Sequence, residues 1–101
     1  MNEKILNIEF DCQGFTLKGM LHLPDSDCPP LVIGSHGLEG TMDSAKQIVL
    51  SRLLVRHQMA FFRFDHRGCG QSQGDFLHDT SLEKRTRDFI AAVRHVTGLN
   101  K

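Results

Sequence analysis

The sequence of 101 residues has no tryptophan and no tyrosine, and it contains only three cysteines and three prolines. The cysteines are odd in number and none stands in a CxxC spacing, which argues against a disulfide framework and against a zinc site. No stretch approaches the roughly 18 apolar residues of a membrane helix, and the N-terminus lacks the apolar core of a signal peptide. We therefore expect a cytoplasmic protein with reduced thiols, neither secreted nor inserted in a membrane.

An excess of charge of either sign is also missing. Lys plus Arg equals Asp plus Glu at 12 each, and no run of like charge stands out. Because nucleic acids and anionic membranes attract proteins with clustered positive charge, neither is expected as a partner. Apolar residues make up 40% of the chain and charged residues 24%, as in ordinary globular proteins. The composition therefore predicts one packed domain, or part of one, over residues 1–101, with a small or neutral partner.

The first part of the chain has the period of two half-buried strands. Apolar and polar residues alternate over residues 4–12 and again over residues 15–23. Gln13 and Gly14 lie between them, and a short polar connection with glycine suits the positive φ angles of a tight turn. The sequence predicts an antiparallel hairpin over residues 4–23, which the prolines of residues 24–30 bring to an end.

A parallel unit is predicted next. Residues 31–36 open with a continuous apolar run, which is typical of a strand covered on both faces, and residues 59–65 repeat that pattern. Between them, Asp43 or Ser44 can cap a helix. The apolar face expected for this helix consists of Ala45, Ile48, Val49, Leu53 and Val55. Residues 31–65 therefore form a βαβ unit with parallel strands.

A last helix is expected at about residues 81–97, after a polar, glycine-rich loop. Ser81 can cap it, and Glu83 lies in its first turn. The predicted apolar stripe consists of Leu82, Phe89, Ile90, Val93 and Val96. The fold class that follows is α/β: an antiparallel hairpin, a parallel βαβ unit and a further helix.

Two loops follow the predicted parallel strands, at the edge where open α/β sheets bind ligands. In the first, SHGLEGTMDS, Gly37 and Gly40 leave the amides around Leu38 unshielded by side chains, so that they could hold a developing oxyanion. In the second, DHRGCGQSQGDF, Asp65 and Arg67 are near enough to brace the glycine-rich path by hydrogen bonds.

These motifs, in this order, resemble the α/β-hydrolase superfamily, in particular its small carboxylesterase and serine aminopeptidase-like branches. The segment similar to the HGxxG oxyanion motif comprises Ser35, His36, Gly37, Leu38 and Gly40. The segment similar to the DxRGxGxS loop comprises Asp65, Arg67, Gly68, Gly70 and Ser72. The opening hairpin is matched by Gly14, Leu17, Gly19, Leu21 and Pro24, and the last helix by the acidic Asp88. The resemblance covers almost the whole chain.

The resemblance implies a division of roles. The residue after HG contributes a backbone N–H to the oxyanion hole, and that residue is Leu38 here. The nucleophile of such enzymes follows the next strand of the sheet, and the acid and the histidine come later still, so all three are expected beyond Lys101. The chain then corresponds to the N-terminal portion of the fold. By itself it should show no triad catalysis.

The stretch GQSQG at residues 70–74 fits the GxSxG pattern of a nucleophile elbow, which would make Ser72 a nucleophile. An elbow needs a strand running directly into the first glycine and a helix starting directly after the serine. Here the predicted strand ends near Asp65, and the next helix is expected only at about Ser81. We therefore interpret Ser72 as a hydroxyl that braces the loop through hydrogen bonds to nearby backbone.

Other residues that could act in catalysis or bind a cofactor are also interpreted as structural. His36 could be a base, but a bracing role is favoured for it, and Cys69 is favoured as a small loop residue over a redox thiol. The histidines show no HxH or HExxH spacing, so no metal site is expected. The glycines of GCGQSQG are spaced GxGxxxG, which makes a dinucleotide site a weak alternative, and no cofactor is expected.

Two functions of different classes follow. The first is the N-terminal portion of a serine hydrolase that acts on carboxylic ester or related acyl bonds in a small molecule. The second is a non-enzymatic interaction module. In the family's strand order the strand LVIGS would lack a neighbour on one side, and an exposed apolar edge recruits partner strands. This alternative predicts a homodimer or a bound partner chain across that edge.

Overall fold

The computed structural model describes residues 4–26, 28–37 and 40–99. Its elements, in chain order, are β1 (Lys4–Cys12), β2 (Phe15–Leu23), β3 (Leu31–Ser35), α1 (Ala45–Arg56), β4 (Ala60–Phe64), α2 (Phe76–Asp79) and α3 (Leu82–Leu99). The predicted hairpin, the βαβ unit and the last helix are all present. The short helix α2, which Asp75 caps by accepting a hydrogen bond from the His78 amide, was not expected from the sequence.

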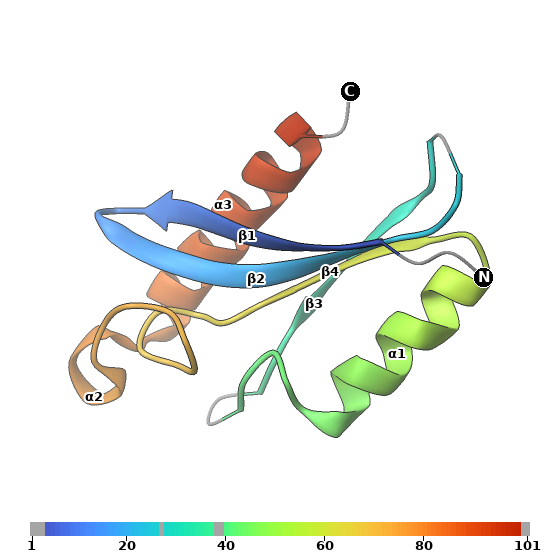
Figure 1. Cartoon of the computed structure of the whole chain (residues 1–101). Helices are drawn as coiled ribbons and strands as arrows, with labels where there is room; N and C mark the ends of the chain where they lie inside the picture. The colour runs from blue at the N-terminus through green and yellow to red at the C-terminus, as the bar shows by residue number, and fades with distance from the viewer. Residues whose placement is uncertain (1–3, 27, 38–39, 100–101) are drawn as a thin grey trace.

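The strands form one four-stranded sheet in the order β1-β2-β4-β3. β1 pairs antiparallel with β2, β2 pairs antiparallel with β4, and β3 runs parallel to β4. The helices α1 and α3 cover opposite faces of this sheet (Figure 1). The carboxyl ends of β3 and β4 therefore lie side by side, and the loops that leave them meet at one edge of the sheet.

The hairpin turn has the backbone that its sequence predicts. Gln13 has φ 51° and Gly14 has φ 90°. Two consecutive positive φ angles between antiparallel strands are characteristic of a type I′ turn, whose twist matches that of the flanking strands. The strands pair from Cys12 opposite Phe15 to Lys4 opposite Leu23, so the tight turn sets the register of the whole hairpin.

The main core lies on the α3 face of the sheet. Phe10 of β1 packs against Phe62 and Phe64 of β4, with ring centroids 6.0 and 5.8 Å apart. Ala92 and Val96 of α3 complete this cluster on the side of the helix. Burial of large aromatic side chains is the dominant favourable contribution to folding in a domain of this size.

The two parallel strands are buried to different extents, which corrects one expectation. The strand β4 is buried at every position, because it lies between β2 and β3. The strand β3, predicted to be covered on both faces, is half-buried along most of its length and exposed at Ser35. Its position at the edge of the sheet is the physical reason, since an apolar run does not reveal whether a strand is central.

The predicted apolar face of α1 is also partly wrong. Val49 and Leu53 are 63% and 48% exposed, whereas Val55 is buried. The helix instead buries Gln47 and Ser51, which lie two turns and one turn before Val55 on the same side. Gly34 of β3 has no side chain, and this leaves room for Gln47: the position that a Cβ on Gly34 would occupy is 2.9 Å from Gln47 Oε1. Polar side chains can therefore face the sheet here.

The stripe predicted for α3 needs a similar correction. Val96 is buried, and Phe89 and Val93 are half-buried, but Leu82 and Ile90 are 84% and 43% exposed. The buried face includes Asp88 in their place, with 0% exposure. A buried carboxylate on the packing face of a helix needs compensating partners, and these belong to the site described below.

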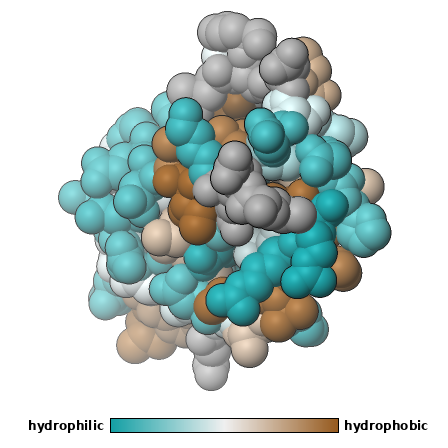
Figure 2. Space-filling view, turned by 45° about the vertical axis from the view of Figure 1, so that its right-hand side comes forward, coloured by the Kyte–Doolittle hydropathy of each residue, from teal (hydrophilic) through white to brown (hydrophobic). Residues whose placement is uncertain are grey.

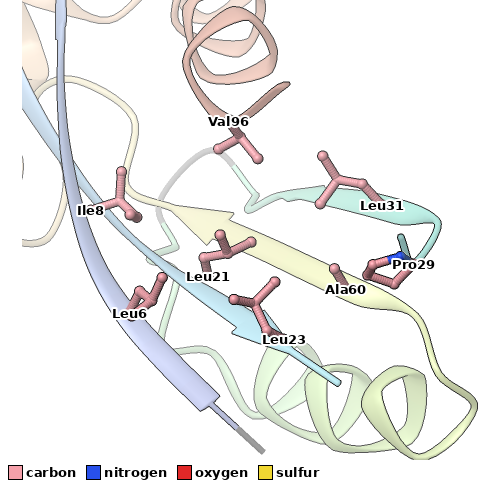
Figure 3. Close-up of a pocket in the computed structure, with 8 residues that line it drawn as sticks. All are labelled: Leu6, Ile8, Leu21, Leu23, Pro29, Leu31, Ala60 and Val96. Atoms are coloured by element: carbon pink, nitrogen blue, oxygen red, sulfur yellow. The ribbon is translucent and has the colours of Figure 1, made fainter. Parts of the chain in front are cut away.

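An apolar pocket of about 290 Å³ opens between the sheet and the C-terminal part of α3 (Figure 3). It is lined by Leu6, Ile8, Leu21, Leu23, Pro29, Leu31, Ala60 and Val96. Leu31 and Ala60 begin β3 and β4, so the pocket lies at the opposite end of these strands from the two loops.

In the described part of the chain, none of the helices has both the length and the apolar character of a membrane-spanning segment.

Candidate functional site

The loops after β3 and β4 are joined by one buried carboxylate. Oδ1 of Asp65 accepts a hydrogen bond of 2.7 Å from the amide of Met42, and Oδ2 accepts one of 2.9 Å from the amide of Gln71. Asp65 is 1% exposed. Gly70 has φ 48°, and a Cβ there would overlap this carboxylate. The glycine therefore allows the second loop to wrap closely around Asp65, as the bracing role predicted.

Ser72 makes the two hydrogen bonds that its interpretation as a brace requires. Its hydroxyl donates to the carbonyl oxygen of Asp65 at 2.6 Å and accepts from the amide of Lys18 at 2.9 Å. The side chain is buried, β4 ends at Phe64, and the next helix begins at Phe76. The strand–turn–helix bend of a nucleophile elbow is therefore absent around Ser72 in the described residues 40–99.

His36 holds the start of the first loop, which follows β3 and carries the segment similar to the HGxxG motif. Its Nε2 accepts a hydrogen bond of 3.0 Å from the amide of His66, and its Nδ1 lies 2.7 Å from the carbonyl oxygen of Gly37. Burial lowers the pKa of His36 below its ordinary value of 6.5, more than the Gly37 carbonyl raises it. A neutral imidazole with its proton on Nδ1 fits both contacts, so His36 acts as a brace in this structure.

Leu38, the residue implied as the oxyanion-hole amide, lies outside the described residues. The residues on either side of it are held in place. Arg85 Nη2 donates 2.6 Å to the carbonyl oxygen of His36, and the amide of Gly40 donates 3.0 Å to the carbonyl oxygen of Gly37. Together with the bond from Met42 to Asp65, these contacts anchor the loop on both sides.

A buried ion pair ties the second loop to α3. Arg67 Nε lies 2.9 Å from Asp88 Oδ1, and the Arg67 amide donates 2.9 Å to Asp88 Oδ2. Burial raises the pKa of Asp88, but its interactions with His66 and with the amide and guanidinium of Arg67 lower it further, to below the ordinary 3.8. Asp88 is therefore ionised at neutral pH, and this compensates for its position on the packing face of the helix.

The guanidinium of Arg67 also reaches the hairpin. Its Nη2 donates 3.0 Å to Gln13 Oε1 and lies 3.3 Å from Cys12 Sγ, and the group stacks 5.0 Å above the ring of Phe15. One buried side chain thus connects the hairpin turn, the second loop and α3. Such a planar, many-donor contact is specific to arginine.

One contact in this region was missed by the sequence analysis. Ser35 Oγ lies 2.7 Å from His66 Nε2, and His66 Nδ1 lies 3.5 Å from Asp88 Oδ2. Ser35 and His66 are 31 positions apart in the chain, and no local motif marks His66 among the six histidines. Only the parallel pairing of β3 with β4 brings the two residues together.

Three alternatives from the sequence analysis can be compared with the described residues: a redox thiol at Cys69, a dinucleotide site and a metal site. Cys69 is buried, and burial raises the pKa of its thiol above 9.0, which opposes thiolate chemistry. Gly68, Gly70 and Gly74 all have positive φ in a winding loop, not at the start of a helix as a dinucleotide motif requires. Within residues 4–26, 28–37 and 40–99, no three His, Cys, Asp or Glu side chains gather as metal ligands would.

A shallow pocket, open to solvent, lies between the two loops. A cavity of about 340 Å³ is lined by Gly40, Thr41, Gly68, Cys69, Gly70 and Phe76. These residues come from both loops, and the cavity lies at the carboxyl end of the parallel strands. The arrangement is typical of ligand sites in α/β folds.

Comparison with known proteins agrees with this geometry. A family model described as serine aminopeptidase, S33, matches residues 28–101. Est1E from Butyrivibrio proteoclasticus, solved with ferulic acid bound, is 28% identical with a TM-score of 0.86, over 92% of this chain and 38% of Est1E. Comparison with curated proteins gave no match.

Two further solved structures, both under 25% identical, show the fold. A putative α/β hydrolase from Agrobacterium tumefaciens is 24% identical with a TM-score of 0.79, over 94% of this chain and 44% of that one. An α/β serine hydrolase homologue from Coxiella burnetii is 22% identical with a TM-score of 0.75, over 94% and 46%. The chain spans less than half the length of each of these structures. Since the family model covers well over half of the chain, the chain belongs to the serine aminopeptidase S33 family of α/β hydrolases.

Proposed function

We propose that this chain forms the N-terminal portion of a serine hydrolase that acts on carboxylic ester or related acyl bonds. Its contribution to the active site is the backbone amide of Leu38, which donates to the oxyanion of the tetrahedral intermediate. The nucleophile, the acid and the histidine come from a following part of the fold. In the complete enzyme the serine forms an acyl-enzyme, which water then hydrolyses.

The anchoring of the loop around Leu38 carries this proposal. An oxyanion donor is effective when it is held in place before the reaction, so that no reorganisation is needed as charge develops. His36 and Met42 flank the donor, and both are tied to the second loop through His66 and Asp65. Because those contacts are buried and largely made by fixed backbone amides, the loop is suited to hold such a donor.

The substrate class is supported by one relative. Est1E was solved with ferulic acid, an aromatic carboxylic acid. A carboxylic ester is therefore the first substrate to test for the complete enzyme, with amides and thioesters as related acyl compounds. The cavity between the two loops is the place that we propose for the acyl group.

Two measurements test the proposal. The coding sequence after Lys101 is expected to encode another apolar strand followed directly by a GxSxG segment and a helix. The protein that it encodes is expected to hydrolyse p-nitrophenyl esters and to lose that activity when the serine of this new segment is replaced by alanine. A stop codon directly after Lys101, or an extended protein without esterase activity, would contradict the proposal.

In the extended protein, Ser72→Ala is expected to leave ester hydrolysis unchanged and to lower the free energy of unfolding by about 1–2 kcal/mol. The substitution removes the acceptor of the Lys18 amide and the donor to the Asp65 carbonyl, and unpaired buried groups of this kind cost that much. The measurements are p-nitrophenyl acetate turnover and urea unfolding. Ser26→Ala, at an exposed position, is the control and should change neither quantity. Loss of turnover in a folded Ser72→Ala protein would instead identify Ser72 as a nucleophile.

A second function, of a different class, is supported by the edge of the sheet. In the described residues, β3 has a strand neighbour on one side only. The face shown in Figure 2 carries separate hydrophobic patches among hydrophilic residues. The large apolar side chains exposed in the described part are Ile5, Val49, Leu53, Leu77, Leu82 and Ile90. An unpaired edge strand and exposed apolar side chains each favour association, so an interaction module is the alternative.

Size-exclusion chromatography with light scattering tests the alternative. If the chain acts as an interaction module, it should elute with the mass of a dimer or of a complex, since a second strand would satisfy the free backbone groups of β3. Dilution should shift the mass toward the monomer. A stable monomer of 11.4 kDa at all concentrations, folded by circular dichroism, would remove the reason for this alternative.

A further inference from the structure

A serine, a histidine and an aspartate from three parts of the chain are aligned at the carboxyl end of β3. Ser35 Oγ is 2.7 Å from His66 Nε2, which is a hydrogen-bond distance. His66 Nδ1 is 3.5 Å from Asp88 Oδ2, an ion-pair distance too long for a strong hydrogen bond. We propose that these residues form a nucleophilic site, in which Ser35 accepts an acyl or phosphonyl group from activated esters and fluorophosphonates.

The imidazole of His66 is held in one orientation. It is 1% exposed, and its ring packs 4.7 Å from the ring of Phe64 and 4.9 Å, edge to face, from that of His36. Its Nδ1 is buried without a hydrogen-bond partner, and the nearby carboxylate of Asp88 favours a proton there. With Nδ1 protonated, Nε2 is free to accept the proton of the Ser35 hydroxyl, which is the tautomer that a general base needs.

Asp88 acts as a positioning residue for His66. It is ionised, but its charge is shared with the guanidinium of Arg67, which lies 2.9 Å from Oδ1. The field that Asp88 exerts on the imidazole is therefore weaker than that of an unshared carboxylate. For this reason we expect reaction with compounds that carry good leaving groups, and not with unactivated amides.

Ser35 differs from Ser72 in both accessibility and partner. In the 101-residue chain, Ser35 is exposed at the carboxyl end of β3. Ser72 is buried, and its hydroxyl donates to a backbone carbonyl, which cannot take up its proton. The serine within the GxSxG pattern is thus shielded, while a serine outside any nucleophile motif is presented to solvent beside a base.

The acylation step is balanced within these residues. Ser35 Oγ attacks the carbonyl carbon of an aryl ester, a C–O bond forms, and the hydroxyl proton passes to His66 Nε2. The bond to the phenolic oxygen breaks, and the leaving group takes that proton as a phenol. Water then attacks the acyl-serine with the same base and releases a carboxylic acid. With a fluorophosphonate, fluoride is the leaving group and the adduct on Ser35 persists.

The test uses the 101-residue chain and a fluorophosphonate probe, with the modified serine located by peptide mass spectrometry. General base catalysis contributes about 10²–10⁴-fold, so Ser35 is expected to react at least about 100-fold faster than the other serines. Those internal controls are Ser26, Ser44, Ser51, Ser72 and Ser81. In His66→Gln the side chain at position 66 cannot take up the proton. Ser35 is still present in this variant, but its labelling rate should fall close to that of the other serines.

Folding is checked in the same experiment. The His66→Gln protein is compared with the wild type by circular dichroism, and the wild type is also labelled in urea, where the advantage of Ser35 should vanish. No adduct on Ser35, or an adduct that forms equally fast in urea or in a folded His66→Gln protein, would overturn the proposal. Since the test needs no residue beyond Lys101, its failure would leave the proposed hydrolase function untouched.

Discussion

Asp88→Asn is expected to lower the free energy of unfolding by about 3–5 kcal/mol, the usual cost of leaving one partner of a buried ion pair alone. Arg67 is 3% exposed and Asp88 is 0% exposed, so water cannot replace the missing partner. Domains of this size are stable by only about 5–15 kcal/mol. Urea unfolding followed by circular dichroism should show a much lower midpoint.

Two further variants separate this effect from a general sensitivity to charge. Glu83→Gln breaks the ion pair with Arg87, which is 3.0 Å long but half or more exposed on both sides, and should cost less than about 0.5 kcal/mol. The double variant Arg67→Met with Asp88→Leu removes both buried charges and should be more stable than Asp88→Asn. If Asp88→Asn were as stable as Glu83→Gln, the assigned role of the ion pair would be wrong.

The same pair predicts the acid sensitivity of the protein. The pKa of Asp88 lies below its ordinary 3.8 in the folded state, so the unfolded state binds the proton more readily. The stabilisation is complete above the unfolded pKa and is lost as the pH falls below it, through the folded pKa. In Asp88→Asn, the free energy of unfolding should therefore depend less steeply on pH below about 3.8 than in the wild type.

Asp65→Ala is expected to lower the free energy of unfolding by about 2–4 kcal/mol. The amides of Met42 and Gln71 both lose a charged acceptor, and Met42 is only 2% exposed. Because Asp65 joins the two loops, amide hydrogen exchange should become faster in the loop around Met42, while the hairpin changes less. Urea unfolding and hydrogen exchange measured by NMR check the two parts of this prediction.

Asp25→Ala provides the matched control for Asp65→Ala. It removes the same side chain from an exposed position before β3, so its effect on stability should lie within about 0.5 kcal/mol. An Asp65→Ala protein with wild-type stability and wild-type exchange at Met42 would show that the carboxylate does not hold the loops together. The loop that carries Leu38 would then not be anchored through Asp65, contrary to the proposed oxyanion role.

Much of the fold could be predicted from local patterns. Alternation over residues 4–12 and 15–23, and the short connection at Gln13 and Gly14, predicted the hairpin because period and turn geometry are properties of a few adjacent residues. The exposure of individual residues was harder to predict. Val49 and Leu53 are exposed although they lie on a periodic apolar pattern, because the sheet surface facing α1 accommodates Gln47 and Ser51 instead.

In the site, too, features that depend on neighbouring residues could be predicted, and a contact between distant residues could not. Local motifs predicted the two loops, the bracing roles of Asp65, Arg67 and Ser72, and the failure of GQSQG as an elbow, because each depends on residues close in the chain or on the spacing to the next element. His66 and Ser35 could not be paired from the sequence. They are 31 positions apart, and their contact depends on the register of β3 against β4.

By itself, the sequence determined the α/β class, the order of the elements and the family motifs, since these follow from periodicity and spacing along the chain. The tertiary structure alone decided which strand lies at the edge, which residues of α1 and α3 are buried, and which serine stands beside a base. Those properties depend on long-range packing: β4 is buried by its neighbours, and Ser35 meets His66 only after β3 and β4 have paired.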